Sequence, residues 1–248
     1  MILHGRTALV TGGVSGIGKA TAWELARCGA QVIVADVNRD GGHAAESEAK
    51  AHGLPITYAS LDLADLASID ACAAAVLARF GCVDVLVNAA GWDRMQPFLE
   101  NTPDFIDRIL AINLRGPIGL TQKLLPAMAA NGYGKIVNVS SDAGRVGSLG
   151  ETVYAAAKGG MIAFTKSLAR EVARYNITVN CVCPGPTDTP LFHAQPEKLK
   201  VALEKAIPFK RIAKPQEPAD AILFFASPRS DYVTAQVLSV SGGLTMVG

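Results

Sequence analysis

Short runs of β-branched and other apolar residues alternate with longer amphipathic stretches along the chain. Seven runs have the character of strands: Thr7–Thr11, Gln31–Asp36, Ile56–Asp62, Val83–Asn88, Lys135–Ser140, Ile177–Val182 and Gln236–Val240. Several are apolar nearly throughout, which is typical of strands buried on both faces of a parallel sheet. The helical stretches between them include Gly18–Cys28, Leu66–Phe80, Asp104–Ala130 and Tyr154–Tyr175. The alternation predicts an α/β fold, a single-domain Rossmann-type doubly wound sheet of seven mainly parallel strands with helices on both faces.

The charge balance is nearly neutral and argues against several classes of partner. Lys and Arg number 23 against 22 Asp and Glu, so the chain lacks the basic surface of a nucleic-acid-binding protein. No apolar run approaches the roughly 18 residues that a membrane span requires, and the first residues do not resemble a secretory signal. The five cysteines lack CxxC spacing and the four histidines are scattered, so we expect neither a disulfide framework nor a metal site. These features predict a cytoplasmic protein with one domain over residues 1–248.

A glycine-rich segment, Thr11-Gly12-Gly13-Val14-Ser15-Gly16-Ile17-Gly18, follows the first predicted strand and opens a helix. Doubly wound sheets bind ligands beyond the carboxyl ends of their strands, so this position favours a cofactor site. Gly12 permits the tight turn, Gly16 lets the backbone approach a pyrophosphate, and Gly18 permits close packing of helix on strand. The free N–H groups of the helix start would face the phosphates, with Ser15 and Ile17 beside them. An ordinary glycine turn is the alternative.

Asp36 ends the second predicted strand and indicates which dinucleotide binds. An acidic residue at this distance from the glycine turn holds the hydroxyls of the adenosine ribose. A 2′-phosphate about 4 Å from the carboxylate would be repelled by about 4 kcal/mol at an effective dielectric constant of about 20. Arg39 is close enough in sequence to soften this repulsion, and a solvated strand-end Asp is the alternative interpretation. We predict NAD rather than NADP.

Tyr154, Lys158 and Ser141 form a candidate acid–base set. Tyr154 and Lys158 are four residues apart in a predicted helix, so their side chains share one helical face. A phenol has a pKa of about 10, and a neighbouring ammonium group is expected to lower the pKa of Tyr154. Ser141 follows a predicted strand, where its hydroxyl can bond a carbonyl or alkoxide oxygen of a substrate. The Tyr–Lys spacing is common by chance and gains significance from its coincidence with the glycine turn and the strand-end serine.

Together these motifs resemble the short-chain dehydrogenase/reductase family over the whole chain. Further segments carry the resemblance: Asp62-Leu63, Asn88-Ala89-Ala90-Gly91, Ile112-Asn113-Leu114, and Pro184-Gly185 followed by Thr187 and Thr189. The resemblance implies a catalytic set of Asn113, Ser141, Tyr154 and Lys158, in which the asparagine holds a water that connects the lysine to solvent. It also implies cofactor contacts from Asp62, Leu63, Asn88, Gly91, Tyr154, Lys158, Pro184, Gly185, Thr187 and Thr189. The chain departs from the family at Ala89, where a second Asn is usual, and at Ser241, where Asp is usual.

The resemblance implies an NAD-dependent oxidoreductase that converts a secondary alcohol into a ketone. Tyr154, as phenolate, would take the hydroxyl proton while Ser141 steadies the oxygen and the nicotinamide accepts the hydride. Lys158 would lower the pKa of the tyrosine and bind the nicotinamide ribose. Two alternatives stay open: a 3-oxoacyl thioester or ketone reductase working in the other direction, and a binding module that senses a dinucleotide without turnover.

Four segments are most similar to family members that oxidise 2-hydroxycyclohexanecarboxyl-CoA to the 2-oxo acyl-CoA. They are Gly91-Trp92-Asp93, Ser141–Gly147, Cys183–Thr189 and the tail Gln236–Met246. This similarity implies a cyclic or bulky secondary alcohol as substrate, in the form of a CoA thioester. Arg145 and Trp92 are candidate substrate contacts. The alternatives are an Arg145 paired with Asp142 or Glu151, and a Trp92 that lies outward or in the core.

Residues 189–214 correspond to the substrate lid of the family. Within them, six basic side chains outnumber two acidic ones and could attract CoA phosphates: Lys198, Lys200, Lys205, Lys210, Arg211 and Lys214 against Glu197 and Glu204. A solvated helix is the alternative. The long apolar-faced helices predicted over Asp104–Ala130 and Tyr154–Tyr175 would leave exposed stripes on a monomer. The family pairs them across subunits, which implies a homotetramer, with a dimer as the alternative.

Overall fold

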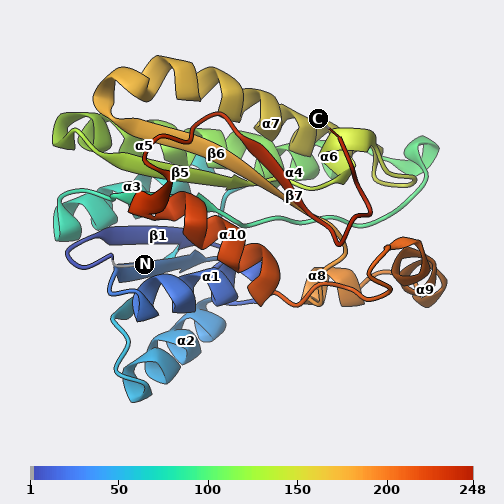
Figure 1. The fold of residues 1–248 in the computed structure, drawn as a ribbon, viewed down its shortest axis with the longest axis horizontal. Coiled ribbons are helices and arrows are strands. Elements are labelled where there is room, and N and C mark those ends of the chain that lie inside the picture. Colours follow the sequence, from blue (N-terminus) through green and yellow to red (C-terminus); the bar gives the residue numbers. More distant parts are fainter. Residues whose placement is uncertain (1–2, 248) are drawn as a thin grey trace.

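The computed structural model describes residues 3–247 and confirms the predicted α/β fold (Figure 1). The strands form one sheet in the order β3-β2-β1-β4-β5-β6-β7, and every neighbouring pair is parallel. Their bounds are β1 (Thr7–Thr11), β2 (Gln31–Asp36), β3 (Ile56–Ser60), β4 (Val85–Asn88), β5 (Gly134–Val139), β6 (Ile177–Pro184) and β7 (Val237–Val240).

Helices cover both faces of the sheet, as the sequence predicts. Their bounds are α1 (Gly16–Arg27), α2 (Arg39–Ala51), α3 (Leu66–Phe80), α4 (Pro103–Leu110), α5 (Gly116–Asn131), α6 (Ala143–Val146), α7 (Thr152–Val172), α8 (Pro190–His193), α9 (Glu197–Ala206) and α10 (Gln216–Ala226). One core lies under α1, α2 and α10, and a second lies under α3, α5 and α7. Figure 1 shows α7 on one side of the sheet and α1 and α10 on the other. In the described part of the chain, no helix combines the length and apolar character that a bilayer crossing demands.

The strands are apolar on both faces because both faces are buried. In β1, Val10 contributes to the core under α1 and α10, while its neighbour Leu9 contributes to the core under α3, α5 and α7. Successive side chains of a strand point to opposite faces, so a two-sided sheet needs consecutive apolar residues. The apolar runs of the sequence therefore identify the central strands directly.

The helix predicted over Asp104–Ala130 is confirmed, with one irregularity inside it. The structure divides it into α4 and α5, separated by a π-helical turn over Ala111–Arg115. The cause is Asn113, whose Nδ2 donates to the carbonyl of Ile109 at 2.9 Å and so takes over an acceptor that the regular helix ladder would use. The same amide also binds the loop that follows β4, through hydrogen bonds with the backbone of Trp92.

The sheet order reverses its direction between β1 and β4, and this places the candidate site. From β1 the chain runs outward to β2 and β3, and it then returns to β4 on the other side of β1. The connections leave a crevice at the carboxyl ends of these two strands, where doubly wound sheets bind their ligands. Thr11, which ends β1, accepts hydrogen bonds from the backbone N–H groups of Ala89 and Ala90, both at 3.0 Å, and so fixes the chain beyond β4.

Candidate active site

The glycine turn lies at the carboxyl end of β1 and presents the start of α1. Gly12 and Gly16 have φ angles of 65° and 51°, in the left-handed region that favours glycine. A Cβ atom on Gly18 would collide with the carbonyl oxygen of Gly12, so this position requires glycine for close packing of the helix on the turn. Ser15 is the N-cap, but its side chain makes no capping bond, and the first turn of α1 contains no acidic residue. Free N–H groups and the positive end of the helix dipole suit the phosphates of a dinucleotide.

Asp36 lies at the end of β2, next to the glycine turn, because Gly12 donates its N–H to the carbonyl of Ala35 at 2.9 Å. The Asp36 carboxylate is partly exposed and accepts a hydrogen bond from the N–H of Asn38 at 3.0 Å. The side chain of Arg39 is exposed at the start of α2. Along the same edge, the Asp62 carboxylate accepts from the N–H of Ala64 at 2.8 Å. Asp36 thus borders the turn, and Asp62 lies on the far side of Asp36, since the N–H of Leu61 donates to the Asp36 carbonyl at 3.1 Å.

Ser141, Tyr154 and Lys158 meet at the carboxyl end of β5. Tyr154 and Lys158 lie one turn apart in α7 and are both buried, and the Lys158 ammonium lies 5.5 Å from the centre of the tyrosine ring. The Ser141 side chain lies beside the Tyr154 hydroxyl and lowers its pKa. Lys158 donates to the carbonyl of Val139 at 2.9 Å, and its own carbonyl accepts from Ser140 at 2.7 Å. The end of β5 and the first turns of α7 are thus tied together around the hydroxyl pair.

The expected lowering of the tyrosine pKa by the lysine is not what the structure shows. Burial raises the pKa of Tyr154, the negative charges of Glu151 and Asp93 raise it further, and the Ser141 side chain lowers it. Burial also lowers the pKa of Lys158 to about 8, although Cys181, Cys183 and Asp93 oppose this. The neutral phenol is therefore the favoured form of Tyr154. Burial also makes Lys158 lose its proton more easily than a lysine in water.

Asn113 and Gly91 enclose the lysine from the other side. The Asn113 amide bonds the backbone of Trp92 twice, accepting from its N–H at 3.2 Å and donating to its carbonyl at 2.7 Å. A Cβ atom on Gly91 would lie 3.1 Å from Asn113 Oδ1 and 3.5 Å from Lys158 Nζ. A side chain at residue 91 would therefore crowd the Asn113 amide and touch the lysine.

The segment after β6 closes the cofactor side of the crevice. Gly185 follows the strand, and the Thr187 hydroxyl donates to the Gly185 carbonyl at 2.9 Å. Thr189 caps α8 and lies against the glycine turn, because a Cβ atom on Gly16 would lie 3.0 Å from its methyl carbon. Ser241, the departure from the family noted above, accepts from the N–H of Thr245 at 3.2 Å and stabilises the turn after β7.

The side chains of two sequence-predicted residues make contacts within the protein. The Asn88 amide lies in the core, where its Nδ2 donates to Asn138 at 2.8 Å and joins β4 to β5, while its Oδ1 is buried without a partner. Arg145 donates to Ser239 at 2.9 Å and to the carbonyl of Val247 at 2.8 Å, and neither predicted pairing with a carboxylate forms. Both bonds connect Arg145 to the C-terminal segment.

Trp92 does lie beside the catalytic candidates. Its ring packs edge-on against Phe105 at 5.7 Å and belongs to the apolar cluster that contains Tyr154, Ala143 and Ala157. The guanidinium of Arg108 covers the ring from outside at 4.1 Å. This position makes Trp92 one wall of the region around the tyrosine.

Sequence reasoning missed the carboxyl groups of Asp93 and Glu151. Asp93 follows Trp92 in the loop after β4, and Glu151 immediately precedes α7, three residues before Tyr154. Their sequence separation of 58 positions hides the contact between them. Only their positions in the sequence could have pointed to them. Asp93 follows the candidate substrate contact Trp92, and Glu151 precedes the candidate tyrosine by nearly one helical turn.

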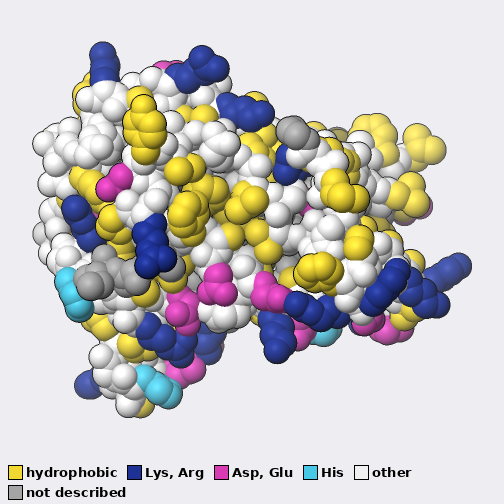
Figure 2. Space-filling view, in the orientation of Figure 1, with side chains coloured by type: hydrophobic (Ala, Val, Ile, Leu, Met, Phe, Trp, Pro, Cys, Tyr) yellow, Lys and Arg dark blue, Asp and Glu magenta, His cyan; other side chains and the backbone are white. Residues whose placement is uncertain are grey.

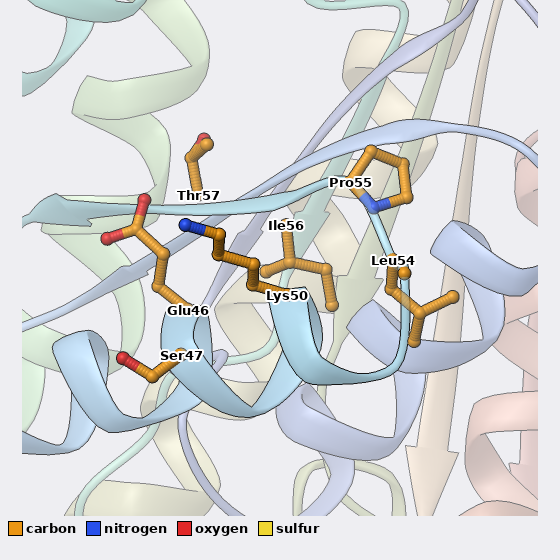
Figure 3. A pocket seen from close by; sticks show the side chains of 8 residues that line it. Glu46, Ser47, Lys50, Leu54, Pro55, Ile56 and Thr57 are labelled. Atoms are coloured by element: carbon orange, nitrogen blue, oxygen red, sulfur yellow. The ribbon is translucent and has the colours of Figure 1, made fainter.

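Other hollows lie away from this site. A surface groove of about 600 Å³ lies between α2 and the edge strand β3, and Figure 3 shows Glu46 and Lys50 of the helix beside Thr57 of the strand. It contains none of the candidate residues. Within residues 3–247, no three His, Cys, Asp or Glu side chains gather in a way that could hold a metal ion.

Comparisons with known proteins agree with the geometry. A family model described as Enoyl-(Acyl carrier protein) reductase matches residues 12–245. The chain is 40% identical to a 3-oxoacyl-(acyl-carrier-protein) reductase of Thermotoga maritima over 99% of its own length and 100% of that protein. It is 36% identical to a hydroxy(phenyl)methylsuccinyl-CoA dehydrogenase subunit of Thauera aromatica, with 99% of both chains covered.

Solved structures give the same result. A putative gluconate dehydrogenase from Agrobacterium tumefaciens superposes with a TM-score of 0.95 at 30% identity, over 99% of this chain and 98% of that one. A levodione reductase superposes with a TM-score of 0.92 at 32% identity, over 97% and 98%. These relatives are dehydrogenases and reductases by name, which favours an enzyme over a dinucleotide sensor. The chain belongs to the short-chain dehydrogenase/reductase family and is a nicotinamide-dependent oxidoreductase that acts on CH–OH or C=O groups.

Proposed function

We propose that this protein is an NAD-dependent dehydrogenase that oxidises a secondary alcohol to a ketone. The observation that carries the proposal is the position of Ser141 beside Tyr154 at the carboxyl end of β5, with the buried Lys158 one turn further along α7. A substrate oxygen placed between the two hydroxyls can be bonded by one while it exchanges a proton with the other.

The residues around the crevice fit a dinucleotide. The glycine turn and the start of α1 offer backbone N–H groups to a pyrophosphate, and Gly18 leaves no room for a side chain there. Asp36 would accept from the ribose hydroxyls, and its charge disfavours a 2′-phosphate, which supports NAD over NADP. The further contacts proposed are Asp62 and Leu63 toward the adenine, and those near the nicotinamide: Gly91, Lys158, Pro184, Gly185, Thr187 and Thr189.

In the oxidative direction Tyr154 takes the proton of the substrate hydroxyl, and Ser141 donates a hydrogen bond to the oxygen as negative charge develops. When bound, the nicotinamide supplies the hydride acceptor and a positive charge near the tyrosine. Lys158 adds a second positive charge, which opposes the effect of burial on the Tyr154 pKa. Asn113 holds the loop that brings Trp92 to the site.

A cyclic secondary alcohol in the form of a CoA thioester, such as 2-hydroxycyclohexanecarboxyl-CoA, is the substrate class we propose. A relative named as a CoA-ester dehydrogenase, 36% identical over the whole chain, supports it. Residues 189–214, proposed as the lid, include α8 and α9, which extend beyond the sheet (Figure 1). Dark blue Lys and Arg side chains gather on this part of the surface in Figure 2, as an entrance for CoA phosphates requires.

A 3-oxoacyl thioester reductase is the second candidate. The raised pKa of Tyr154 favours it, because the neutral phenol is the form that gives a proton to a ketone. The 40% identity to a protein named as a 3-oxoacyl reductase also supports it. In either direction we propose a homo-oligomer, a tetramer, located in the cytoplasm, and sedimentation of the purified protein tests the assembly.

A screen for NADH formation tests the proposed function. Cyclic hydroxy acids, their CoA thioesters and aryl alcohols are offered with NAD⁺ and, in parallel, with NADP⁺. We expect turnover of a cyclic hydroxyacyl-CoA with NAD⁺. Turnover only as NADPH-dependent reduction of 3-oxoacyl thioesters would replace the first candidate with the second, and no turnover in any combination would contradict both.

A further inference from the structure

Two carboxyl groups meet beside the candidate tyrosine, and neither has a role in the reaction proposed above. Asp93 is only 8% exposed, its Oδ2 is fully buried without a donor, and its side chain lies within hydrogen-bond reach of the Glu151 carboxyl. The two segments that carry them are joined, since the N–H of Gln96 donates to the carbonyl of Gly150 at 3.0 Å and Met95 packs against the same glycine. The contact therefore belongs to the fold of the site.

Two ionised carboxylates cannot hydrogen-bond each other, because neither has a proton to donate. The pair is stable only if it shares a proton, and burial together with Glu151 raises the pKa of Asp93 to about 7. Among residues 3–247, no lysine, arginine or histidine forms a salt bridge with either group. Lys158 is the cation that acts on Asp93, and its ammonium is already bonded to the Val139 carbonyl. At neutral pH the pair thus carries a negative charge that Lys158 attracts but that no salt bridge in the described chain neutralises.

Asp93 is buried and Glu151 is partly exposed, and placing a negative charge on a pair with one buried member is costly compared with apolar side chains of the same size. The charge also acts at the reacting position, because both carboxyls raise the pKa of Tyr154. A substrate bound to the tyrosine hydroxyl therefore lies within the field of the pair. A neutral substrate is tolerated there and a hydroxyl or amide of it can donate to the pair, whereas an ionised carboxylate next to the reacting carbon is repelled.

We propose that the Asp93–Glu151 pair determines substrate specificity by excluding free hydroxy acids and admitting their neutral esters or thioesters. The inference rests on the proposed function, since it assumes oxidation of a hydroxyl at Tyr154. It explains how an enzyme that oxidises a hydroxyacyl thioester could fail to oxidise the free hydroxy acid with the same carbon skeleton. The lid lysines play no part in this selection, because the reacting end of the molecule is the same in both compounds.

The test compares ethyl 2-hydroxycyclohexanecarboxylate with 2-hydroxycyclohexanecarboxylate, which share the carbinol and contain no phosphate. We measure kcat/KM for NADH formation with wild type, Glu151→Gln and Asp93→Asn, and with Glu171→Gln, an exposed residue in the last turn of α7, as the matched control. The wild type should prefer the ester by about a hundredfold, and each site variant should reduce this preference by about tenfold or more, through faster oxidation of the acid. The control should keep the wild-type ratio.

The ratio should also change with pH. Between pH 6 and 8 the acid substrate stays ionised while Asp93 loses its proton, so the ester preference should grow more in the wild type than in Asp93→Asn. Lys158, with a pKa of about 8, also loses positive charge in this range and changes the ratio, but it does so in both enzymes, so the difference between their pH profiles reports Asp93. Normal oxidation of the ester with an unchanged ratio in both site variants would overturn the inference and leave the proposed function standing. If the wild type oxidises neither compound while another alcohol is a good substrate, the inference is also wrong, and if no alcohol is oxidised the proposed function itself fails.

Discussion

The side-chain amide of Asn113 pairs with the backbone of Trp92 as a strand residue would, with one bond in each direction, at 3.2 and 2.7 Å. The third bond of this amide, to Ile109, opens the π-helical turn. One side chain therefore both distorts its own helix and fixes the loop that carries Trp92 and Asp93. π turns are frequently found at functional sites, and here the turn sets the distance between that loop and Lys158.

Gly91→Ala should impair the enzyme without unfolding it. The added methyl group would press on Asn113 at 3.1 Å and on Lys158 at 3.5 Å, displacing groups that the reaction needs in place. We expect kcat/KM to fall by about tenfold or more. Gly119→Ala in α5 is the matched control, since its methyl group would meet no atom nearer than 3.8 Å and activity should be unchanged. Equal activity of the two variants would show that the loop does not position the site.

Tyr154→Phe should abolish most turnover while cofactor binding survives. The substitution removes the one hydroxyl that can exchange a proton with the substrate, and the ring remains to fill the same buried space. General acid–base catalysis contributes about a hundredfold or more, and kcat should fall by that amount. Binding of NADH, followed by its fluorescence, should be within a few-fold of wild type. A phenylalanine variant with near-normal turnover would refute the assignment of Tyr154.

Much of this arrangement could be predicted because its signals are local. The glycine turn, Asp36 and the Tyr154–Lys158 spacing each depend on residues within a few positions of an element boundary, and the buried strands reveal themselves by runs of apolar residues. Strand ends were less certain: β3 ends at Ser60 rather than Asp62, since Asp62 turns back to cap Ala64.

What could not be predicted depends on burial or on contacts between distant segments. The sequence places a lysine beside a tyrosine but does not reveal that both are buried, and burial outweighs the lysine in setting the pKa of Tyr154. Arg145 is a candidate substrate contact in the sequence because it follows Ser141 by four residues. In the folded chain the C-terminal segment accepts its hydrogen bonds. The same holds for Asp93 and Glu151, which only the folded chain brings together.

Asp36→Asn should weaken the preference for NAD⁺. Removing the charge eliminates the repulsion of a 2′-phosphate while the amide can still bond the ribose hydroxyls. The ratio of kcat/KM for NAD⁺ to that for NADP⁺ should fall by about tenfold or more. Asp40→Asn, an exposed acid in the first turn of α2, is the control and should leave the ratio unchanged. If Asp36→Asn keeps the wild-type ratio, Asp36 does not select the cofactor.

The stability of the protein should depend on pH through Asp93. Its pKa is raised from the ordinary value of 3.8 to about 7, so the folded state binds a proton that the unfolded state releases. A raised carboxyl pKa means that stability is greatest below about pH 4 for this group and is lost as pH rises through 7. Asp93→Asn should therefore have a higher Tm than wild type at pH 8 and show no such advantage at pH 4. Thermal unfolding at both pH values decides this, and an advantage that does not grow with pH would show that Asp93 is ionised at no cost.

The basic side chains of α9 should matter only for substrates that carry phosphates. Lys200 is paired with Glu197 at 2.6 Å, but Lys198 and Lys205 are exposed on the same helix, where phosphates of CoA could reach them. Salt screens exposed charges, so KM for a hydroxyacyl-CoA should rise with ionic strength, whereas KM for the matching ethyl ester should not. Replacing Lys198 and Lys205 together by Glu should raise KM for the CoA ester at low salt and remove most of the salt dependence. The same reversal at Lys50, on the distant helix α2, should have neither effect, and a salt dependence that persists in the double variant would place the phosphate contact elsewhere.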